Sequence, residues 1–282
     1  MALSPVFTNM TESASRAALG KRESASNRIR VSFIDVGKGD CILLQLGEAA
    51  ALIDTGYEQT AEKVVSYLRE QGVCNLEFVL ISHYDRDHIG GIRAIGSAFP
   101  VGLVYLPDYV GADKNYRALA KAIGDLGLPT QRVSTPLSSN IGDALLALYP
   151  SPVEYAPDAS GGEGNDNDLS LAASLTSGEG SYLFAGDLEE EGIAAFLEGG
   201  HGQFDVLKMP HHGEKSSCLD ELLDEVRPRL AVITDSSDEP ADKKTLKQLG
   251  KADIDVYRTS EFATIVVMED GAGGYSVSCA RR

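Results

Sequence analysis

Hydrophobic residues alternate with polar residues, or form short unbroken runs, along most of the chain from residue 29 onward. Runs of roughly four to eight residues between turn residues predict strands, and apolar residues three or four apart predict helices. Strands are predicted at 29–36, 41–46, 50–53, 78–81, 101–106, 144–149, 169–175, 182–184, 205–209, 230–234, 255–258, 263–268 and 275–279. Helices are predicted at 60–70, 116–126, 219–226 and 243–249.

The order of these elements predicts the architecture. Strands and a helix come first, mixed elements follow, and strands with helices return in the C-terminal half. This order favours two β-rich halves with helices outside, an α/β/β/α layered sandwich, and we expect residues 29–282 to form one domain. Residues 1–28 are rich in Ser, Ala and Glu without a sustained period, so we expect a disordered tail or, alternatively, an arm that docks on a partner subunit.

Net charge separates the candidate functions. The 282 residues include 25 Lys and Arg against 42 Asp and Glu, a formal charge of −17. A surface this acidic repels phosphate backbones and anionic lipid at long range. Strong binding of duplex DNA is therefore not expected.

The cysteines and the hydropathy pattern indicate the environment. The four cysteines are far apart and form no C-x-x-C pair, which argues against a disulfide framework or a zinc ribbon. No apolar run approaches the ~20 residues that a membrane span requires. We therefore expect a reduced, cytoplasmic protein without a membrane span.

Histidines are few, and they are concentrated where strands end. Four of the five fall in two clusters, the segment His83–His88 and the pair His211 and His212, each directly after a predicted strand. Asp187 also follows a predicted strand. Strands fix the backbone while the following loops aim side chains, so a metal site is expected where these strand ends meet.

The spacing within the first cluster suggests how ions would be held. His83 and Asp85 point to the same side of an extended loop, whereas Asp87 and His88 are adjacent and point in different directions. This arrangement favours two ions side by side over one ion in a cage. Imidazole together with carboxylate suits Zn, Mn or Fe.

The residues around this cluster allow two interpretations. Gly90 and Gly91 would let a following helix approach a neighbouring strand closely, as a built site requires. Alternatively, the segment is a solvated loop whose carboxylates pair with Arg86. The second histidine pair and Asp187 favour the metal site.

These residues resemble those of a known family. His83–His88, followed by Ile89-Gly90-Gly91, resembles the signature H-x-[HD]-x-D-H of the metallo-β-lactamase fold, and the form with Asp third is similar to the hydrolase domain of ComEC-type DNA-uptake (competence) proteins. Further segments resemble that family in the same order: Phe33–Asp40, Leu52–Gly56, Asn167–Leu171, Leu183–Asp187, Leu207–Gly213 and Tyr257–Thr259. The resemblance spans residues 29–280 and implies an αβ/βα four-layer sandwich.

The resemblance also implies a metal centre with two divalent ions, Zn²⁺ first and Mn²⁺ as the alternative. His83 and Asp85 would hold one ion, Asp87, His88 and His211 the other, and Asp187 would bridge them. A hydroxide bound between the ions would attack phosphorus in line, oriented by Asp87.

The same resemblance assigns further roles. His212 is the candidate acid for the leaving oxygen, or a ligand if the adjacent histidines have exchanged roles. The candidate substrate contacts are Asn167, Ser170, Ser217 and Lys208, each with a structural role as the alternative. Asp40 and Asp54 are expected to fix turns near the site.

The sequence departs from the family pattern at positions that bear on these roles. Lys38 stands where the family has Gln, and Glu214 where it has Ser. No histidine lies between His88 and Asp187, and Asn167 lies in that region instead. The first ion site is therefore expected to have too few ligands.

These residues favour a metal-dependent phosphodiesterase or nuclease acting on single-stranded DNA, a nucleotide or another small phosphodiester. The alternatives are a hydrolase of a carboxylic ester, lactone or thioester, and a non-catalytic metal-binding interaction module. The uptake proteins join such a domain to a membrane channel, and we expect no channel in this sequence.

Overall fold

Two mixed sheets form the centre of the molecule. The computed structural model describes residues 28–157, 164–270 and 273–281, so the tail predicted for residues 1–28 lies almost wholly outside the described residues. In the described part, the first sheet has eight strands in the order β15 (Tyr275–Ser278), β14 (Ile265–Glu269), β1 (Arg30–Phe33), β2 (Ile42–Leu46), β3 (Ala49–Ile53), β4 (Val79–Leu80), β5 (Val104–Pro107) and β6 (Thr130–Val133). The second has seven, in the order β13 (Asp255–Arg258), β12 (Leu230–Ile233), β11 (Val206–Lys208), β10 (Gly180–Phe184), β9 (Ala172–Ser177), β8 (Ala144–Tyr149) and β7 (Leu137–Ile141).

Each sheet changes from antiparallel to parallel pairing along its width. Strands β15 to β3 pair antiparallel and β3 to β6 pair parallel. In the second sheet, β13 to β10 pair parallel and β10 to β7 antiparallel. The parallel part of each sheet is the part that needs helical crossovers, and it is there that helices cover the outer faces.

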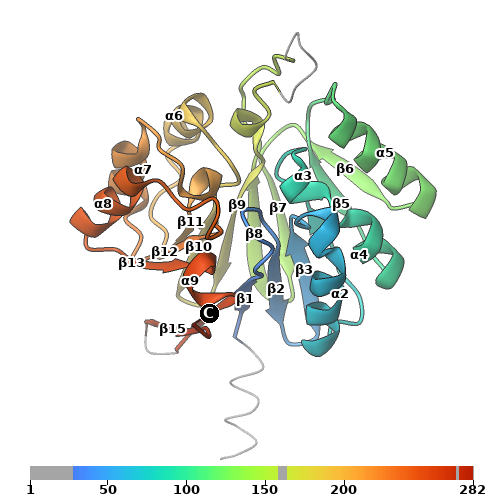
Figure 1. The fold of residues 1–282 in the computed structure, drawn as a ribbon, viewed down its shortest axis with the longest axis horizontal. Coiled ribbons are helices and arrows are strands. Elements are labelled where there is room, and N and C mark those ends of the chain that lie inside the picture. Colours follow the sequence, from blue (N-terminus) through green and yellow to red (C-terminus); the bar gives the residue numbers. More distant parts are fainter. Residues whose placement is uncertain (1–27, 158–163, 271–272, 282) are drawn as a thin grey trace, which may run out of the picture.

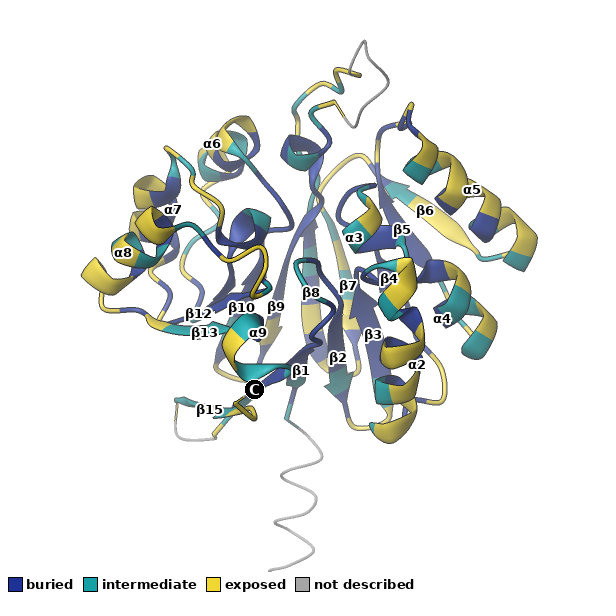
Figure 2. Ribbon diagram, viewed as in Figure 1, coloured by how far each residue is buried: buried dark blue, intermediate teal, exposed yellow. Residues whose placement is uncertain are grey.

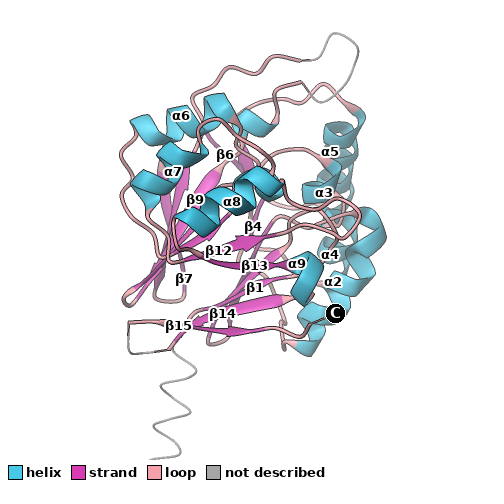
Figure 3. Ribbon diagram, turned by 60° about the vertical axis from the view of Figure 1, so that its left-hand side comes forward, coloured by secondary structure: helices cyan, strands magenta, loops and turns pink. Residues whose placement is uncertain are grey.

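Helices form the outermost layers. They are α2 (Ala61–Glu70), α3 (Arg86–Ile89), α4 (Ile92–Ala98), α5 (Lys114–Leu126), α6 (Glu190–Glu198), α7 (Leu219–Val226), α8 (Lys243–Lys251) and α9 (Thr259–Phe262), with short 3-10 turns η1 (Glu58–Thr60), η2 (Asn167–Leu169) and η3 (Pro210–Gly213). Figure 1 shows α2, α4 and α5 on one side of the sheets and α6, α7 and α8 on the other, and Figure 3 shows the same arrangement from a second direction. The predicted four-layer α/β sandwich is confirmed.

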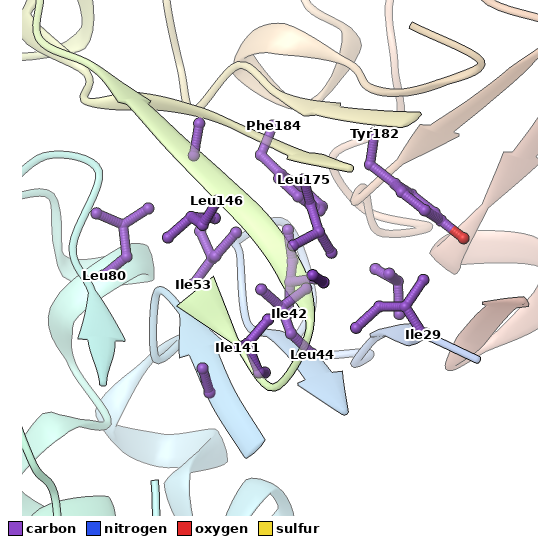
Figure 4. Close-up of a cluster of buried hydrophobic side chains, with 14 of the residues drawn as sticks. Ile29, Ile42, Leu44, Ile53, Leu80, Ile141, Leu146, Leu175, Tyr182 and Phe184 are labelled. Carbon is purple, nitrogen blue, oxygen red and sulfur yellow. The ribbon is translucent and has the colours of Figure 1, made fainter. Parts of the chain in front are cut away.

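The burial of β2 explains why its sequence is almost uniformly apolar. Ile42, Leu44 and Leu46 enter the core between the two sheets, whereas Cys41 and Leu43 pack under the helices of the first sheet. Both faces of the strand are covered, so the polar half of the usual alternation is missing. Figure 4 shows side chains of the inter-sheet core from both halves of the chain, Ile42 and Leu44 beside Leu146 and Leu175. Figure 2 shows the buried strands between helices whose outer faces are exposed.

Some elements differ from the sequence prediction. Helix α6 and strands β6 and β7 were not predicted, and the described part of the chain places them at edges or surfaces. Strand β7 has the sequence LSSNI and buries only Ile141 fully. An edge strand with polar residues on its exposed positions lacks the apolar pattern that identifies central strands.

Candidate metal centre

The ends of five strands bring the candidate residues together. Strands β3 and β4 of the first sheet end just before Asp54 and His83, and β10, β11 and β12 of the second end just before Asp187, His212 and Thr234. The carboxyl ends of parallel strands lie at one edge of a sheet, so the loops that follow them converge. The site therefore lies between the two sheets, with ligands from both halves of the chain.

Four side chains form the central cluster. Ligand atoms of Asp87, His88, Asp187 and His212 all lie within 4.8 Å of one another. The Oδ2 atom of Asp187 is 2.9 Å from His212 Nε2 and 3.3 Å from His88 Nε2. The Oδ2 atom of Asp87 is 3.5 Å from His212 Nε2. Imidazole nitrogens and carboxylate oxygens converging in this way are a donor set for a divalent ion such as Zn²⁺.

Hydrogen bonds behind the cluster fix the imidazole tautomers. His88 Nδ1 donates to Asp54 Oδ2 at 2.8 Å. Thr234 uses its hydroxyl hydrogen on Asp40 Oδ1 at 2.6 Å, so its oxygen accepts from His212 Nδ1 at 3.0 Å. Both rings therefore turn Nε2 toward the cluster, as in metal sites where a carboxylate or hydroxyl orients the ligand. Asp40 and Asp54 therefore orient the ligand side chains, and with His88 they also form a second group of ligand atoms within 4.8 Å of one another.

Positive charges in and beside the cluster offset its carboxylates. Burial alone would raise the pKa of Asp187, but the positive charges of His212, His88 and Lys208 hold it well below its usual range. Burial alone would lower the pKa of His212, yet the Asp187 carboxylate and the hydrogen bonds to Asp187 and Asp87 raise it to about 9. A cation would take the place of the protons on these histidines.

His83 and Asp85 lie beside this cluster with unused ligand atoms. The His83 ring is 4.1 Å from the His88 ring, centroid to centroid. Ser82 Oγ donates to Asp54 at 2.7 Å and accepts from His83 Nδ1 at 3.0 Å, which leaves the lone pair of His83 on Nε2. Among the described residues neither His83 Nε2 nor Asp85 Oδ1 has a hydrogen-bond partner, although both atoms are buried. Buried polar atoms without partners are rare, and an ion between them would satisfy both. The residues present therefore fit a metal.

The histidine pair is placed in the opposite way to the sequence assignment. His212 is buried in the cluster, whereas His211 is half-buried and its Nδ1 lies 3.1 Å from Glu189 Oε1. Both have positive φ, 45° and 52°, which turns the two adjacent rings apart. The geometry thus favours His212 as the ligand and leaves His211 facing the pocket.

The four candidate substrate contacts have different surroundings. Ser170 is fully buried, where its Oγ is 3.3 Å from His83 Nδ1 and accepts from the Asp187 backbone at 3.0 Å. Lys208 is also fully buried, and its Nζ contacts Asp40 Oδ2 at 2.5 Å. These two side chains orient ligands and do not reach the pocket, which corrects their assignment as substrate contacts.

The other two candidates lie farther from the central cluster. Asn167 donates from Nδ2 to Glu189 Oε1 at 3.0 Å, next to His211. Ser217 hydrogen-bonds Glu190 through its backbone NH at 3.0 Å. Neither lines the pocket over the cluster. Of these two residues, only Asn167 is connected to a residue of the pocket, because its partner Glu189 also contacts His211.

The pocket over the cluster has a rim that the sequence did not identify. Its volume is about 250 Å³, and its walls include Asp87, Asp187, His211 and His212. Three cations, Lys38, Arg86 and Lys114, also line it. Tyr57 and Glu239 complete this part of the wall. Arg86 was interpreted only as a partner for neighbouring carboxylates, and nothing in the sequence around Lys114 indicated that α5 begins at this pocket.

Close backbone contacts hold the first cluster in place. A Cβ on Gly91 would lie 2.2 Å from the Thr55 carbonyl oxygen, and one on Gly90 would lie 2.4 Å from the Glu58 backbone nitrogen. The Thr55 backbone NH donates to the His88 carbonyl at 2.6 Å. The expectation that these glycines permit close approach is therefore correct.

Comparison with known proteins agrees with this geometry. The profile of the metallo-β-lactamase superfamily matches residues 34–154. This part of the chain is therefore similar to metallo-β-lactamases. It is 30% identical over 213 residues to Recombination protein 2 of Haemophilus influenzae, covering 73% of this chain and 24% of that protein. It is 28% identical over 265 residues to ComE operon protein 3 of Bacillus subtilis, covering 85% of this chain and 33% of that one. The resemblance to the hydrolase domain of ComEC-type competence proteins is thereby confirmed, while the chain spans only a quarter to a third of these relatives.

Solved structures show the same fold at lower identity. The metallo-β-lactamase fold protein YhfI from Bacillus subtilis aligns with a TM-score of 0.55 and 14% identity, covering 86% of this chain and all of that one. Zn²⁺-bound PqqB from Methylobacterium extorquens aligns with a TM-score of 0.54 and 13% identity, covering 78% of this chain and 85% of that one. The fold and its clusters of His and Asp thus support a hydrolase of the metallo-β-lactamase superfamily whose site suits divalent metals. Within the described residues, no helix is long and apolar enough to cross a membrane.

Proposed function

We propose that this chain is a metal-dependent phosphodiesterase that acts on single-stranded DNA, a nucleotide or another small phosphodiester. The observation that carries the proposal is the pocket itself, in which the His and Asp cluster forms the floor and Lys38, Arg86 and Lys114 line the rim. In a chain of net charge −17, the pocket has three cations against one carboxylate, Glu239, besides the proposed metal ligands Asp85, Asp87 and Asp187, and this favours an anionic substrate. Volume supports the small size, because about 250 Å³ has no room for a duplex.

We propose two divalent ions in this centre, Zn²⁺ or Mn²⁺. His83 and Asp85 would hold one, Asp87, His88 and His212 the other, and Asp187 would lie between them. Bound there, such ions lower the pKa of water and neutralise charge on phosphate oxygens.

The chain's own residues have separate roles in this proposal. Asp87, with 17% of its side chain exposed, faces the pocket and accepts a proton from the attacking water. His211 donates a proton to the leaving oxygen, because its ring lines the pocket and Glu189 Oε1 holds Nδ1 at 3.1 Å. Lys38 and Arg86 bind the phosphate oxygens that do not react. His212, the earlier candidate for the acid, is enclosed in the metal cluster.

A groove of about 790 Å³ adjoins the pocket. Its presence favours single-stranded DNA as the substrate over a mononucleotide. The groove and the pocket share Tyr57 and Arg86, and the groove adds Arg69 and Arg93 along α2 and α4. Three arginines there outnumber two glutamates, unlike the chain as a whole. Arg86 lies over the Tyr57 ring at 5.7 Å, a surface on which a base can stack. We therefore propose that flanking nucleotides occupy this groove, and that duplex DNA is a poor substrate.

Turnover of bis-p-nitrophenyl phosphate and of p-nitrophenyl acetate tests the proposal, with added Mn²⁺ or Zn²⁺ and with chelator. Phosphodiester hydrolysis that chelator abolishes and that Asp87→Asn removes is the expected result. Asp143→Asn, on an exposed turn between β7 and β8, is the matched control and should retain full activity. Activity on the acetate ester alone would replace the proposal with ester hydrolysis. A cytoplasmic location is also proposed, and cell fractionation tests it.

A further inference from the structure

The first proposed ion lacks ligands from the residues that the sequence identified. His83 Nε2 and Asp85 Oδ1 both lie buried without partners among the described residues, and His83 Nε2 is 3.8 Å from Asp85 Oδ2. These two residues and the shared Asp187 give three protein ligands, of which only two belong to this ion alone. The sequence offers no histidine between His88 and Asp187 to complete the set.

Asp166 has an unused carboxylate oxygen in this region. Asp166 is 2% exposed, and its Oδ2 accepts a hydrogen bond from the Tyr109 hydroxyl at 3.1 Å. Its Oδ1 is buried and has no hydrogen-bond partner in the part of the chain that the structure describes. A buried carboxylate oxygen without a partner is costly unless a cation is bound to it.

Hydrogen bonds place Asp166 beside the first ion site. The Tyr109 hydroxyl that donates to Asp166 also accepts from the backbone NH of Tyr84 at 3.2 Å, so a single hydroxyl group joins Asp166 to the residue between His83 and Asp85. The residues after Asp166 lie alongside the end of β4. Ser170 Oγ is 3.3 Å from His83 Nδ1, and the Leu171 NH donates to the Ser82 carbonyl at 2.8 Å.

The local charges agree with this position. Besides burial and the Tyr109 hydrogen bond, the charges that act on Asp166 are those of Asp85 and His83, the two residues of the first ion site, and that of Asp113. Asp85 Oδ1 and Asp166 Oδ1 are both buried atoms. Two carboxylates near each other repel, and a divalent cation between them removes that repulsion.

We propose that Asp166 Oδ1 is the further ligand of the ion held by His83 and Asp85, in the place of the missing histidine. This inference rests on the metal centre of the proposed function. The resulting donors are one imidazole and two carboxylates besides Asp187, a harder set than three imidazoles, so it favours Mn²⁺ more than a histidine-rich site does. Asp166 lies in the long loop before β9, where the sequence analysis assigned Asn167 instead.

Metal stoichiometry tests the assignment directly. Wild-type protein is depleted with chelator, titrated with Mn²⁺, and followed by elemental analysis after dialysis and by electron paramagnetic resonance. Two ions per chain, with the spin coupling of a Mn²⁺ pair, are expected. Asp166→Asn keeps the acceptor for Tyr109 but removes the charge, and should bind one ion tightly and the second at least ~10-fold more weakly, with the coupling lost. Asp166→Glu should recover part of the second site.

The control removes a buried carboxylate from the same turn. Asp168 Oδ1 accepts from the backbone NH groups of Glu189 and Gly192 at 3.1 and 2.7 Å, so its oxygen is already used. Asp168→Asn should keep two ions even if its melting temperature falls. Asn167→Ala should also keep two ions, and loss of one ion in that variant instead of in Asp166→Asn would overturn the assignment.

Two outcomes separate this inference from the proposed function. If Asp166→Asn binds two ions with wild-type affinity, the inference about Asp166 is wrong, but the proposed phosphodiesterase function still stands. If wild-type protein binds a coupled ion pair that depends on Asp166 but hydrolyses no phosphodiester, the inference holds and the proposed function fails. A wild-type chain that binds only one ion overturns the inference as well.

Discussion

Lys38 and Glu214 form an ion pair at the mouth of the metal pocket. Lys38 follows β1 and Glu214 follows η3, so the pair joins the two halves of the molecule. Burial alone would lower the pKa of Lys38, but the hydrogen bond to Glu214 and its charge raise it. These are the same two positions at which the sequence departs from the Gln and Ser of the resembling family, so the two departures compensate each other in space.

The ion pair predicts how substitutions there affect substrate binding. Lys38→Gln leaves the Glu214 carboxylate unpaired beside the pocket and should raise the KM for bis-p-nitrophenyl phosphate by up to about fivefold, since exposed ion pairs are worth ~1 kcal/mol or less. Glu214→Ser frees the lysine and should lower the KM. The double variant should lie between the two. Lys215 is exposed and adjacent to Glu214, so Lys215→Gln should leave the KM unchanged. An equal effect on the KM in that control would contradict a specific role for the ion pair.

The histidine pair predicts a separation of metal content from turnover. His211→Ala should retain the ions and lose about 100-fold or more in kcat, because the proton donor is gone while the cluster is intact. His212→Ala should lose an ion, because its Nε2 is 2.9 Å from Asp187 in the cluster. Elemental analysis and kinetics on the same samples measure both. Loss of metal in His211→Ala with retention in His212→Ala would restore the assignment made from the sequence.

This exchange shows where sequence reasoning stops. The sequence predicts a strand at 205–209 followed by two histidines, and β11 (Val206–Lys208) lies within that range. Which ring enters the cluster depends on the positive φ of both histidines, and backbone strain of this kind has no signature in residue type outside glycine. Apolar periodicity identified β8 and α7 with their observed bounds, because each has a regular buried face. The bounds of β13 were also predicted, although this strand buries no residue fully.

Long-range contacts explain the other omissions. The ligand types were visible in the sequence because His83 and Asp187 follow buried strands and Asp87 lies in the same short segment as His83. Asp166 was not, since its relation to His83 runs through the hydroxyl of Tyr109, a residue 57 positions away from it. Lys114 was missed for the same reason, because only the packing of α5 brings it to the pocket.

The hydrogen bond from His88 to Asp54 predicts that a substitution at Asp54 weakens metal binding although Asp54 is not itself a proposed ligand. Asp54→Asn replaces the acceptor that orients His88 Nδ1 at 2.8 Å, so the affinity for the ion in the cluster should fall by about 10- to 100-fold. Competition with a chromophoric chelator measures the dissociation constant. Asp143→Asn is the control on an exposed turn. Unchanged affinity in Asp54→Asn would show that Ser82 and the backbone suffice to hold the ring.

The charges in the cluster predict how the stability of the metal-free protein depends on pH. In the folded state the pKa of His212 is raised to about 9 by Asp187 against the effect of burial, whereas the unfolded value is about 6.5. A raised pKa gives stability that is fully present below pH ~6.5 and is lost as pH rises through ~9. The free energy of unfolding should therefore fall over this window, by on the order of 3 kcal/mol at most from this residue, with His88 acting in the same direction. Urea unfolding in chelator at pH 6, 7.5 and 9 measures the slope, and His212→Asn should flatten it. A wild-type profile that stays level across the window would contradict a charged His212 in the metal-free cluster.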